Sequence, residues 1–317
     1  MSVLGSIRIY LKKLRGPVLC RMWKVPWYRI SQILNQRNKK FWCFLIALSL
    51  GTLIVFGIGL GALLAQRENL RSSLSNGIFW RPTVGTRWQI VLNSTLTNQS
   101  FDAPVYDIDL FLNNARIISS LHANNRKVIC YFSAGSYEPF RPDSDRFHTR
   151  DKGLQLDGWP DEFWLNTNSR NVRKIMKNRL RRAARIGCDG VDPDNIDAFD
   201  NLNGLGLTTN HAIDYLRFLA TEAHRLGLAI GLKNAGAIVT DVLDIMEWEL
   251  NEQCLQFGEC GKFQPFVDVG KPVFHIEYPE IIPNFSMASS DYCRDSRAQG
   301  FSTILKNIQL DDWALNC

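Results

Sequence analysis

The amino-acid sequence predicts an α/β fold, a (β/α)8 TIM-type barrel preceded by a single N-terminal transmembrane helix. Three observations lead to this prediction. A long uncharged segment lies near the N-terminus, strand-like and helix-like segments alternate from Trp88 to the C-terminus, and polar residues follow several of the strand-like segments. Eight strands alternating with helices over roughly 230 residues are typical of such a barrel. A doubly wound sheet is the alternative, but the GxGxxG loop that marks many such sheets is absent from the sequence.

The first 65 residues differ in composition from the rest of the chain. Residues 1–40 contain ten Lys or Arg and no Asp or Glu, and residues 41–65 contain no charged residue. About 20 apolar residues are enough for a helix to cross a membrane, and the basic flank of such a helix stays in the cytoplasm. We therefore predict a basic cytoplasmic tail at 1–40, a transmembrane signal anchor at 41–65, a stalk at 66–80 and the barrel at 81–317.

The sequence beyond the apolar segment is typical of a lumenal or extracellular domain, as expected for a type II protein of the plasma membrane or the secretory pathway. Six of the eight cysteines lie there, and six cysteines allow 15 pairings. Cys254 and Cys260 are close enough in sequence to close one loop, and Cys293 with Cys317 could tie down the C-terminus. The three glycosylation sequons lie there too, at Asn93, Asn98 and Asn284. The spacing of Cys and His indicates no structural zinc, and we predict no metal or other cofactor.

Apolar runs and glycines set the expected boundaries of the strands and helices. The predicted strands are 88–92, 105–110, 127–133, 190–194, 229–233, 245–251, 272–277 and 301–305. The predicted helices are 112–124, 172–186, 211–226, 257–269 and 289–299. Gly187, Gly227, Gly270 and Gly300 each lie between a predicted helix and the next strand, where a glycine commonly ends a helix.

The fourth predicted strand ends in the segment GCDGVDPDNID, residues 187–197. Asp192 and Asp194 are two residues apart, so in an extended strand their side chains lie on the same face. Pro193 and Asn195 predict a turn here, because proline has no N–H for a ladder and asparagine favours turns. Two carboxylates on one face before a loop indicate the rim of an active site. The alternative is an Asp-rich turn that caps the next helix.

Polar residues end other predicted strands in the same way. They are Asp107, Asp109, Tyr131, Ser133, Lys233, Asn234, Glu252, Glu277 and Tyr278. Catalytic residues of a TIM-type barrel lie at the C-terminal ends of its strands, so these carboxylates would meet at one mouth and raise one another's pKa. Such a mouth suits a divalent metal or glycoside hydrolysis, and the five scattered histidines favour a metal-free pair of acidic residues. For each residue alone, a solvated or hydrogen-bonded place at the rim is the alternative.

Aromatic residues near the same loops are candidates for stacking on sugar rings. They are Tyr131, Tyr137, Trp159, Trp164, Trp248 and Tyr278. Packing in the core is the alternative for most of them, Trp248 included.

The motifs WQIVLN, VYDIDLF, KVICYFSAGSYE, GCDGVDPDNID, GLKNAG and NEQC resemble glycoside hydrolase family 114, the endo-α-1,4-polygalactosaminidases, over about residues 80–312. The resemblance implies a TIM-like barrel and an acid pair at the ends of strands four and six, Asp194 and Glu252. We assign Asp194 as nucleophile and Glu252 as acid/base, although the two roles could be exchanged. Asp192 is then expected to bind substrate, and Asp189 at the start of the strand to point away from the mouth.

The resemblance also implies a substrate, a cationic polysaccharide that contains galactosamine. Beyond residue 40 the chain has 27 basic and 31 acidic residues, and a mildly acidic domain attracts a cationic polymer rather than nucleic acid. The candidates for contacts with the ammonium groups are Asp107, Asp109, Asp192 and Glu277. We expect a monomer. The alternatives are a catalytically silent carbohydrate-binding or wall protein and a hydrolase of neutral α-galactose or N-acetylgalactosamine polymers.

Overall fold

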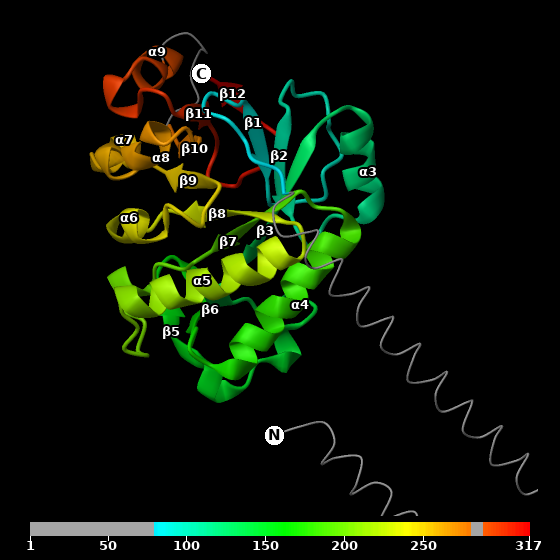
Figure 1. Cartoon of the computed structure of the whole chain (residues 1–317), viewed down its shortest axis with the longest axis vertical. Coiled ribbons are helices and arrows are strands. Elements are labelled where there is room, and N and C mark those ends of the chain that lie inside the picture. The colour runs from blue at the N-terminus through cyan, green and yellow to red at the C-terminus, as the bar shows by residue number, and fades with distance from the viewer. Residues whose placement is uncertain (1–78, 280–287) are drawn as a thin grey trace, which may run out of the picture. The chain divides into compact units, whose positions relative to one another are not determined.

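A computed structural model describes residues 79–279 and 288–317 (Figure 1). The predicted tail and anchor, nearly all of the predicted stalk, and Asn284 lie outside these residues. Among the described helices, none is long and apolar enough to span a bilayer. The transmembrane segment therefore stays a prediction from the sequence.

The centre of the domain is a nine-stranded sheet in which eight parallel strands follow one another in chain order. Its parallel strands are β1 (Trp88–Val91), β2 (Val105–Asp109), β3 (Lys127–Ser133), β7 (Gly190–Asp194), β8 (Ala229–Lys233), β9 (Trp248–Glu252), β10 (Val273–Glu277) and β11 (Ser302–Leu305). The ninth strand, β12 (Leu315–Asn316), pairs antiparallel with β11. Each of the eight predicted strands is present, with boundaries that differ by at most a few residues.

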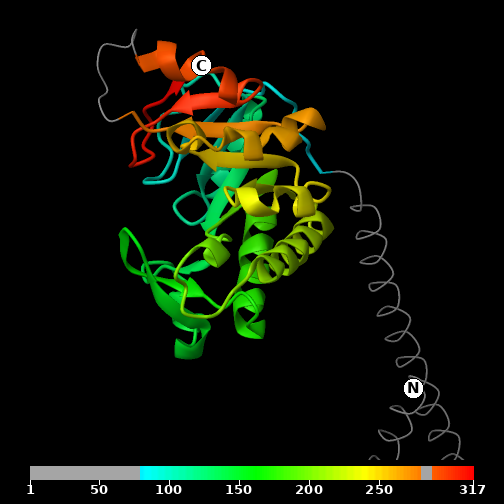
Figure 2. The same cartoon turned by 90° about the vertical axis from the view of Figure 1, so that its left-hand side faces the viewer.

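The sheet curls until its first and eighth strands meet (Figures 1 and 2). Among the described residues no ladder joins β1 to β11. Instead, Trp88 Nε1 donates to the carbonyl oxygen of Ser302 at 2.8 Å, and Leu92 N donates to that of Leu310 at 2.9 Å. This curled sheet is compatible with a TIM-type barrel.

Trp248 fills the inside of the curled sheet, between the strands. A Cβ atom at Gly231 would lie 2.0 Å from its indole nitrogen, and one at Gly190 would lie 2.6 Å from its ring. The indole is fully buried and also contacts Trp80 and Phe274. Trp248 is thus a core residue rather than a platform for sugar, and the two glycines leave room for it.

Three long helices cover the outside of the sheet, and Figures 1 and 2 show them along its outer face. They are α3 (Ala115–Ala123), α4 (Arg170–Ile186) and α5 (Thr209–Arg225), close to their predicted bounds. The predicted helix at 257–269 is wrong, because the chain forms α7 (Cys254–Phe257) and α8 (Gln264–Asp268) instead. Gly258 has a φ of +70° between them, and a proline opens α8, so one continuous helix cannot form.

The remaining helices are short. They are α6 (Val239–Val242), and α9 (Ala288–Cys293) with a 3₁₀ turn at Ser296–Ala298 in place of the predicted helix 289–299. The segment between β1 and β2 has no helix at all, so helices do not follow every strand.

An antiparallel sheet that the sequence analysis missed lies between β3 and α4. It has the order β4 (Ser136–Tyr137), β6 (Trp159–Leu165), β5 (Lys152–Leu156). The turn between β5 and β6 is Asp157-Gly158, and Gly158 has a φ of +77°. An Asp-Gly pair between strand-like runs is a strong hairpin signal, so the sequence held the information.

Three disulfides join the six cysteines of the domain. Cys254–Cys260 closes one loop and Cys293–Cys317 ties down the C-terminus, which confirms both predicted pairings. The third bond, Cys130–Cys188, links β3 to a residue just before the start of β7. It therefore braces β3, which carries Tyr131, and β7, which ends in Asp194.

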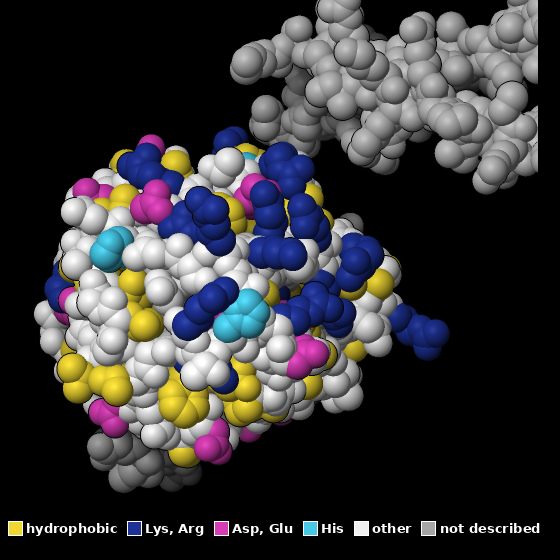
Figure 3. Space-filling model, turned by 90° about the horizontal axis from the view of Figure 1, so that it is seen from below, with side chains coloured by type: hydrophobic (Ala, Val, Ile, Leu, Met, Phe, Trp, Pro, Cys, Tyr) yellow, Lys and Arg dark blue, Asp and Glu magenta, His cyan; other side chains and the backbone are white. Residues whose placement is uncertain are grey.

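Basic side chains gather on α4, which has eight Lys or Arg and no acidic residue. Figure 3 shows many such side chains on the face of the molecule seen from below. Four of the eight bond to residues outside the helix: Arg173, Lys177, Arg179 and Arg182. Four others are exposed: Arg170, Lys174, Arg181 and Arg185. The surface that α4 presents is therefore strongly basic.

Candidate active site

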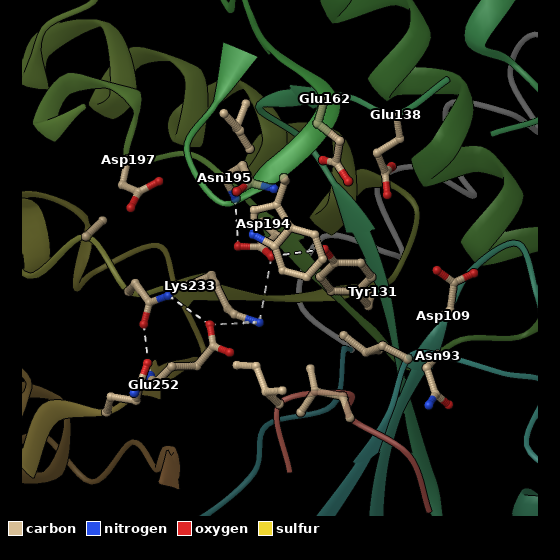
Figure 4. Close-up of a pocket in the computed structure, with 18 of the residues that line it drawn as sticks. Asn93, Asp109, Tyr131, Glu138, Glu162, Asp194, Asn195, Asp197, Lys233 and Glu252 are labelled. Carbon is tan, nitrogen blue, oxygen red and sulfur yellow. Dashed lines mark hydrogen bonds and ion pairs between the residues drawn. The ribbon is translucent and has the colours of Figure 1, made fainter. Parts of the chain in front are cut away.

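A pocket of about 980 Å³ opens at the C-terminal ends of the parallel strands (Figure 4). Every one of the eight strands contributes a lining residue at or just beyond its end. The predicted site residues that line it are Asp109, Tyr131, Asp194, Lys233, Asn234, Glu252 and Tyr278. The pocket therefore lies where the alternation of strands and helices predicts an active site.

Asp194 is the last residue of β7, and the turn after it is tightly packed. Its Oδ2 accepts from the Tyr131 hydroxyl at 3.0 Å, and its Oδ1 accepts from Asn195 N at 2.7 Å. Asn195 has a φ of +59°, consistent with the predicted turn. A Cβ atom at Gly135 would lie 1.6 Å from the Asn195 carbonyl oxygen, so only glycine allows this approach. The backbone thus holds the Asp194 carboxylate at the pocket floor.

Glu252 is the last residue of β9, two strands from Asp194. Its Oε1 accepts from the Tyr278 hydroxyl, and its Oε2 accepts from Asn234 Nδ2 at 3.1 Å. Burial raises the pKa of Glu252, but the Lys233 ammonium and the Tyr278 and Asn234 hydrogen bonds lower it further, so its pKa lies below the ordinary value. Glu252 is therefore a carboxylate in the free protein.

Lys233 ends β8, the strand between β7 and β9, and is only 2 % exposed. Its Nζ lies 3.9 Å from Asp194 Oδ2, 3.7 Å from Glu252 Oε2 and 3.4 Å from Asp192 Oδ2. Burial lowers the pKa of Lys233, but these carboxylates raise it well above its usual value. One buried ammonium thus holds both members of the predicted acid pair (Figure 4).

Asp192 and Asp107 do not line the pocket, although both were expected to contact substrate. Both are fully buried, and neither oxygen of Asp107 has a hydrogen-bond partner among the described residues. Burial raises the pKa of Asp192 to about 6, with Lys233 lowering it and Asp194 raising it. Burial and the neighbouring Asp192 raise the pKa of Asp107 well above its usual value. Side chains two residues apart along a strand lie on the same face of the sheet. Asp192 and Asp107 nevertheless lie deeper than Asp194 and Asp109, below the pocket floor.

Glu277 also lies outside the pocket. It is buried, and its Oε1 accepts from Leu255 N at 2.8 Å and contacts His275 Nε2 at 2.9 Å. Among the described residues, the side chains close enough to share a metal ion are His275 and the cysteines at 254 and 260, which here form a disulfide. Glu277 thus braces the loop after Glu252 rather than facing substrate.

Asp109 lines the pocket, but its charge is already matched. Its Oδ2 pairs with Arg141 Nη1 at 2.6 Å, and its Oδ1 accepts from two backbone N–H groups at 2.8 Å. The other arm of Arg141 pairs with Glu138 at 2.7 Å. Arg141 and Glu138 line the pocket too, and neither was predicted, because both lie in an irregular segment after the two-residue strand β4.

Four further pocket carboxylates were not predicted: Glu162 on β6, Asp197 and Asp200 after β7, and Glu259 after α7. Glu162 belongs to the unpredicted antiparallel sheet. Asp197 lies within the GCDGVDPDNID motif itself, so its proximity to Asp194 in sequence was a usable signal.

The remaining predicted residues divide between the pocket and the rest of the domain. Trp159 is 58 % exposed and lines the pocket, whereas Trp164 is buried and Tyr137 packs against Phe147. Asn93 and Asn98 are exposed, and Asn93 lies at the edge of the pocket. Asp189 immediately precedes β7 and pairs with Lys127 and His122, away from the pocket as expected.

Two carboxylates flanking one buried cation, at the C-terminal ends of a curled parallel sheet, form the arrangement of a glycoside hydrolase. The chain belongs to glycoside-hydrolase family GH114, whose family model matches residues 70–317. It is similar to Ega3 of Aspergillus fumigatus, solved in complex with galactosamine, with 49 % identity, a TM-score of 0.72, and coverage of 75 % of this chain and 97 % of that one.

A second solved structure, the glycoside hydrolase domain of PelA from Pseudomonas aeruginosa, shares the fold. It has 13 % identity and a TM-score of 0.56, and the match covers 72 % of this chain and 97 % of that one. A comparison with curated proteins finds no match.

Proposed function

We propose that the protein is a membrane-anchored, endo-acting glycoside hydrolase that cleaves α-1,4-linked galactosamine in the cationic polysaccharide galactosaminogalactan. The observation that carries this proposal is the pair Asp194 and Glu252, whose carboxylates lie 3.9 and 3.7 Å from the Lys233 ammonium. The similarity to Ega3, solved with galactosamine, supports the substrate class. The pocket's many carboxylates support a cationic ligand.

Two carboxylates can cleave a glycosidic bond without a metal. In the proposed reaction Glu252, ionised in the free protein, takes up a proton when the substrate binds, and Asp194 then attacks the anomeric carbon as the leaving oxygen takes that proton from Glu252. Glu252 then removes a proton from water, which displaces Asp194 and regenerates both groups. If hydrolysis is retaining, the two carboxyl groups act about 5–5.5 Å apart in the complex. The contacts of Glu252 favour its ionised form in the free protein, which is the form that a nucleophile needs.

The roles of the two acids can be separated with azide. Replacing the nucleophile by glycine and adding azide gives a glycosyl azide of inverted configuration. Replacing the acid/base gives one of retained configuration from a substrate with an activated leaving group. Inverted product from Glu252→Gly rather than from Asp194→Gly would exchange the two roles.

The apolar segment 41–65 and the basic residues 1–40 support a type II anchor with the pocket outside the cell or in the lumen. In this arrangement the sequons and disulfides lie in an oxidising, glycosylating compartment. We propose that the protein acts there as a monomer.

The test of the substrate is the release of reducing ends from a de-N-acetylated and from a fully N-acetylated galactosamine polymer. We expect release from the first and little from the second. Cleavage of neutral polymers at equal or higher rate would assign a different substrate, and binding without any release would assign a carbohydrate-binding protein.

A further inference from the structure

The carboxylates of the pocket differ in whether a basic side chain matches their charge. Arg141 pairs with Asp109 and Glu138, Lys262 pairs with Glu259, and Lys233 lies beside the acid pair. The other acidic residues that line the pocket are Glu162, Asp197 and Asp200. No described basic side chain forms an ion pair with any of these three. Asp200 is exposed to water, but Glu162 and Asp197 are half-buried.

Glu162 is held at the pocket wall by the unpredicted antiparallel sheet. Its Oε2 accepts from Ser136 Oγ at 2.9 Å, and Ser136 Oγ lies 2.6 Å from Ser133 Oγ. No hydrogen bond to its other oxygen is formed within the described part of the chain. Trp159, three residues earlier on the same strand, presents an exposed ring to the same pocket. One hairpin thus supplies an apolar platform and a carboxylate with a free oxygen.

Asp197 lies in the turn between β7 and a 3₁₀ helix at Ala198–Asp200. A carboxylate at this place would ordinarily cap the helix, but the Asp197 side chain makes no capping hydrogen bond. It forms no ion pair with a described residue either. Figure 4 shows it on the opposite side of Asp194 from Glu162 and Glu138. The Asp197 carboxylate is therefore available to bind a ligand in the pocket.

We propose that Glu162 and Asp197 each bind the ammonium group of a galactosamine unit, one on either side of the Asp194–Glu252 pair. This inference rests on the proposed function and names the residues that would select free amines. A half-buried carboxylate without a cation is unfavourable, and an ammonium group supplies the missing charge. An N-acetyl group carries no charge and would leave both carboxylates unmatched, so these residues discriminate against acetylated units.

The binding of an ammonium group by Glu162 and Asp197 depends on pH, because only the ionised carboxylates attract it. Burial raises the pKa of Glu162 to about 7, where Glu138 and Asp194 raise it and the Ser136 hydrogen bond and Arg141 lower it. Burial, together with Asp194, Asp200 and Glu252, raises the pKa of Asp197 to about 6. Below these values the groups are neutral and do not attract an ammonium. Affinity for the cationic polymer therefore rises as the pH rises through about 6 and about 7.

The test compares Glu162→Gln and Asp197→Asn with the wild type, as full-length protein in detergent, on de-N-acetylated oligosaccharides. We expect KM to rise about tenfold in each variant, as for loss of a charge-assisted hydrogen bond, while kcat changes less than about twofold. The wild-type KM should fall between about pH 5.5 and about pH 7.5, and this fall should be smaller in each variant. Glu162→Asp, which keeps the charge, should recover part of the lost affinity.

Asp241→Asn is the matched control, because Asp241 is an exposed carboxylate on α6 outside the pocket. Its KM and pH dependence should match those of the wild type, and thermal unfolding of all the variants should be similar. Unchanged KM and pH dependence in Glu162→Gln and Asp197→Asn, with an active wild type, would overturn the assignment. A wild type that does not cleave the de-N-acetylated polymer at all would instead overturn the proposed function.

Discussion

At the scale of residues, the site depends on how one buried ammonium is shared. Lys233 contacts Asp192, Asp194 and Glu252, which come from both neighbouring strands. Burial raises the pKa values of Asp192 and Glu252, and the Lys233 ammonium lowers both. The deeper Asp107, which lacks such a contact, has a pKa raised well above its usual value. The pKa values of neighbouring buried acids at these strand ends are thus shifted in opposite directions, downward for Glu252 and upward for Asp107.

The first prediction concerns the acid pair. Asp194→Asn and Glu252→Gln keep the shape of the side chain but remove the charge or proton that bond cleavage needs. Hydrolysis should fall at least about a hundredfold in each, while folding and binding of the polymer remain. Initial rates of reducing-end release, with binding measured separately, give the answer. Asp189→Asn, whose side chain pairs with Lys127 away from the pocket, should lower stability at most. Near-normal hydrolysis in Asp194→Asn, together with loss of hydrolysis in Asp189→Asn, would contradict the assignment of Asp194.

The second prediction concerns Asp192, whose pKa of about 6 lies above the ordinary value of 3.8. Near pH 5 the folded protein keeps a proton at this residue that the unfolded chain has lost. The corresponding stability is present below about pH 4 and is lost as the pH rises through 6. The free energy of unfolding of the wild type should therefore fall more steeply from pH 4.5 to 7 than that of Asp192→Asn, by about 1–3 kcal/mol. Urea unfolding of both proteins at several pH values measures this difference. The same pH dependence of the free energy of unfolding in both proteins would contradict the prediction.

At the scale of elements, short irregular connections position the acid pair. The turn after β7 is packed against the turn after β3, where Ala134 N and Gly135 N both donate to the Asp194 carbonyl oxygen, at 2.8 and 3.1 Å. The loop after β9 is closed by the Cys254–Cys260 disulfide and braced by Glu277. Both acids are thus the last residue of a regular strand and precede a turn held by hydrogen bonds or a disulfide, so their side chains lose little freedom when substrate binds.

The third prediction tests the packing of these turns. Gly135→Ala would place a Cβ atom 1.6 Å from the Asn195 carbonyl oxygen, so the turn that carries Asp194 must shift. We expect a loss of about 1–3 kcal/mol in the free energy of unfolding and a large loss of turnover. Gly261→Ala is the control, because its Cβ would meet no atom within 4 Å. Normal turnover in Gly135→Ala would mean that Asp194 does not need this turn.

At the scale of the whole molecule, the structure separates two surfaces of opposite charge. The pocket gathers carboxylates, whereas α4 has eight basic residues and no acidic one. The near balance of charge beyond residue 40 therefore hides a strong local contrast. A cationic polymer would be drawn to the pocket and repelled from the flank that carries α4.

The fourth prediction concerns the orientation of the chain in a membrane. Ten basic residues before an uncharged stretch at 41–65 predict that the tail stays in the cytoplasm. Protease added to intact cells or to vesicles with the lumenal face outward should digest the folded domain, or its linker, and spare residues 1–40. Immunoblots with antibodies against each end measure this. Protection of the domain until the cytoplasmic face is exposed would reverse the orientation.

Local sequence patterns were enough to predict the eight parallel strands, the side of the sheet where the pocket lies, and two of the disulfides. They were enough because these features depend on local signals, the period of apolar residues and the polar residue at the end of a strand. The same signals indicated Asp194 and Glu252 among the polar residues at one mouth, and the resemblance to the family's motifs then singled out these two as the acid pair.

The depth of each acidic residue and its pairing with a basic side chain could not be predicted from local sequence patterns. Asp192 shares a face with Asp194, yet it lies below the pocket, because depth depends on how distant strands pack around it. Asp109 lies in the pocket but is paired with Arg141, which comes 32 residues later in the chain. Glu162 reaches the pocket from a hairpin inserted between β3 and α4. The free energy of a carboxylate is set by neighbours that are far apart in sequence, and folding brings them together.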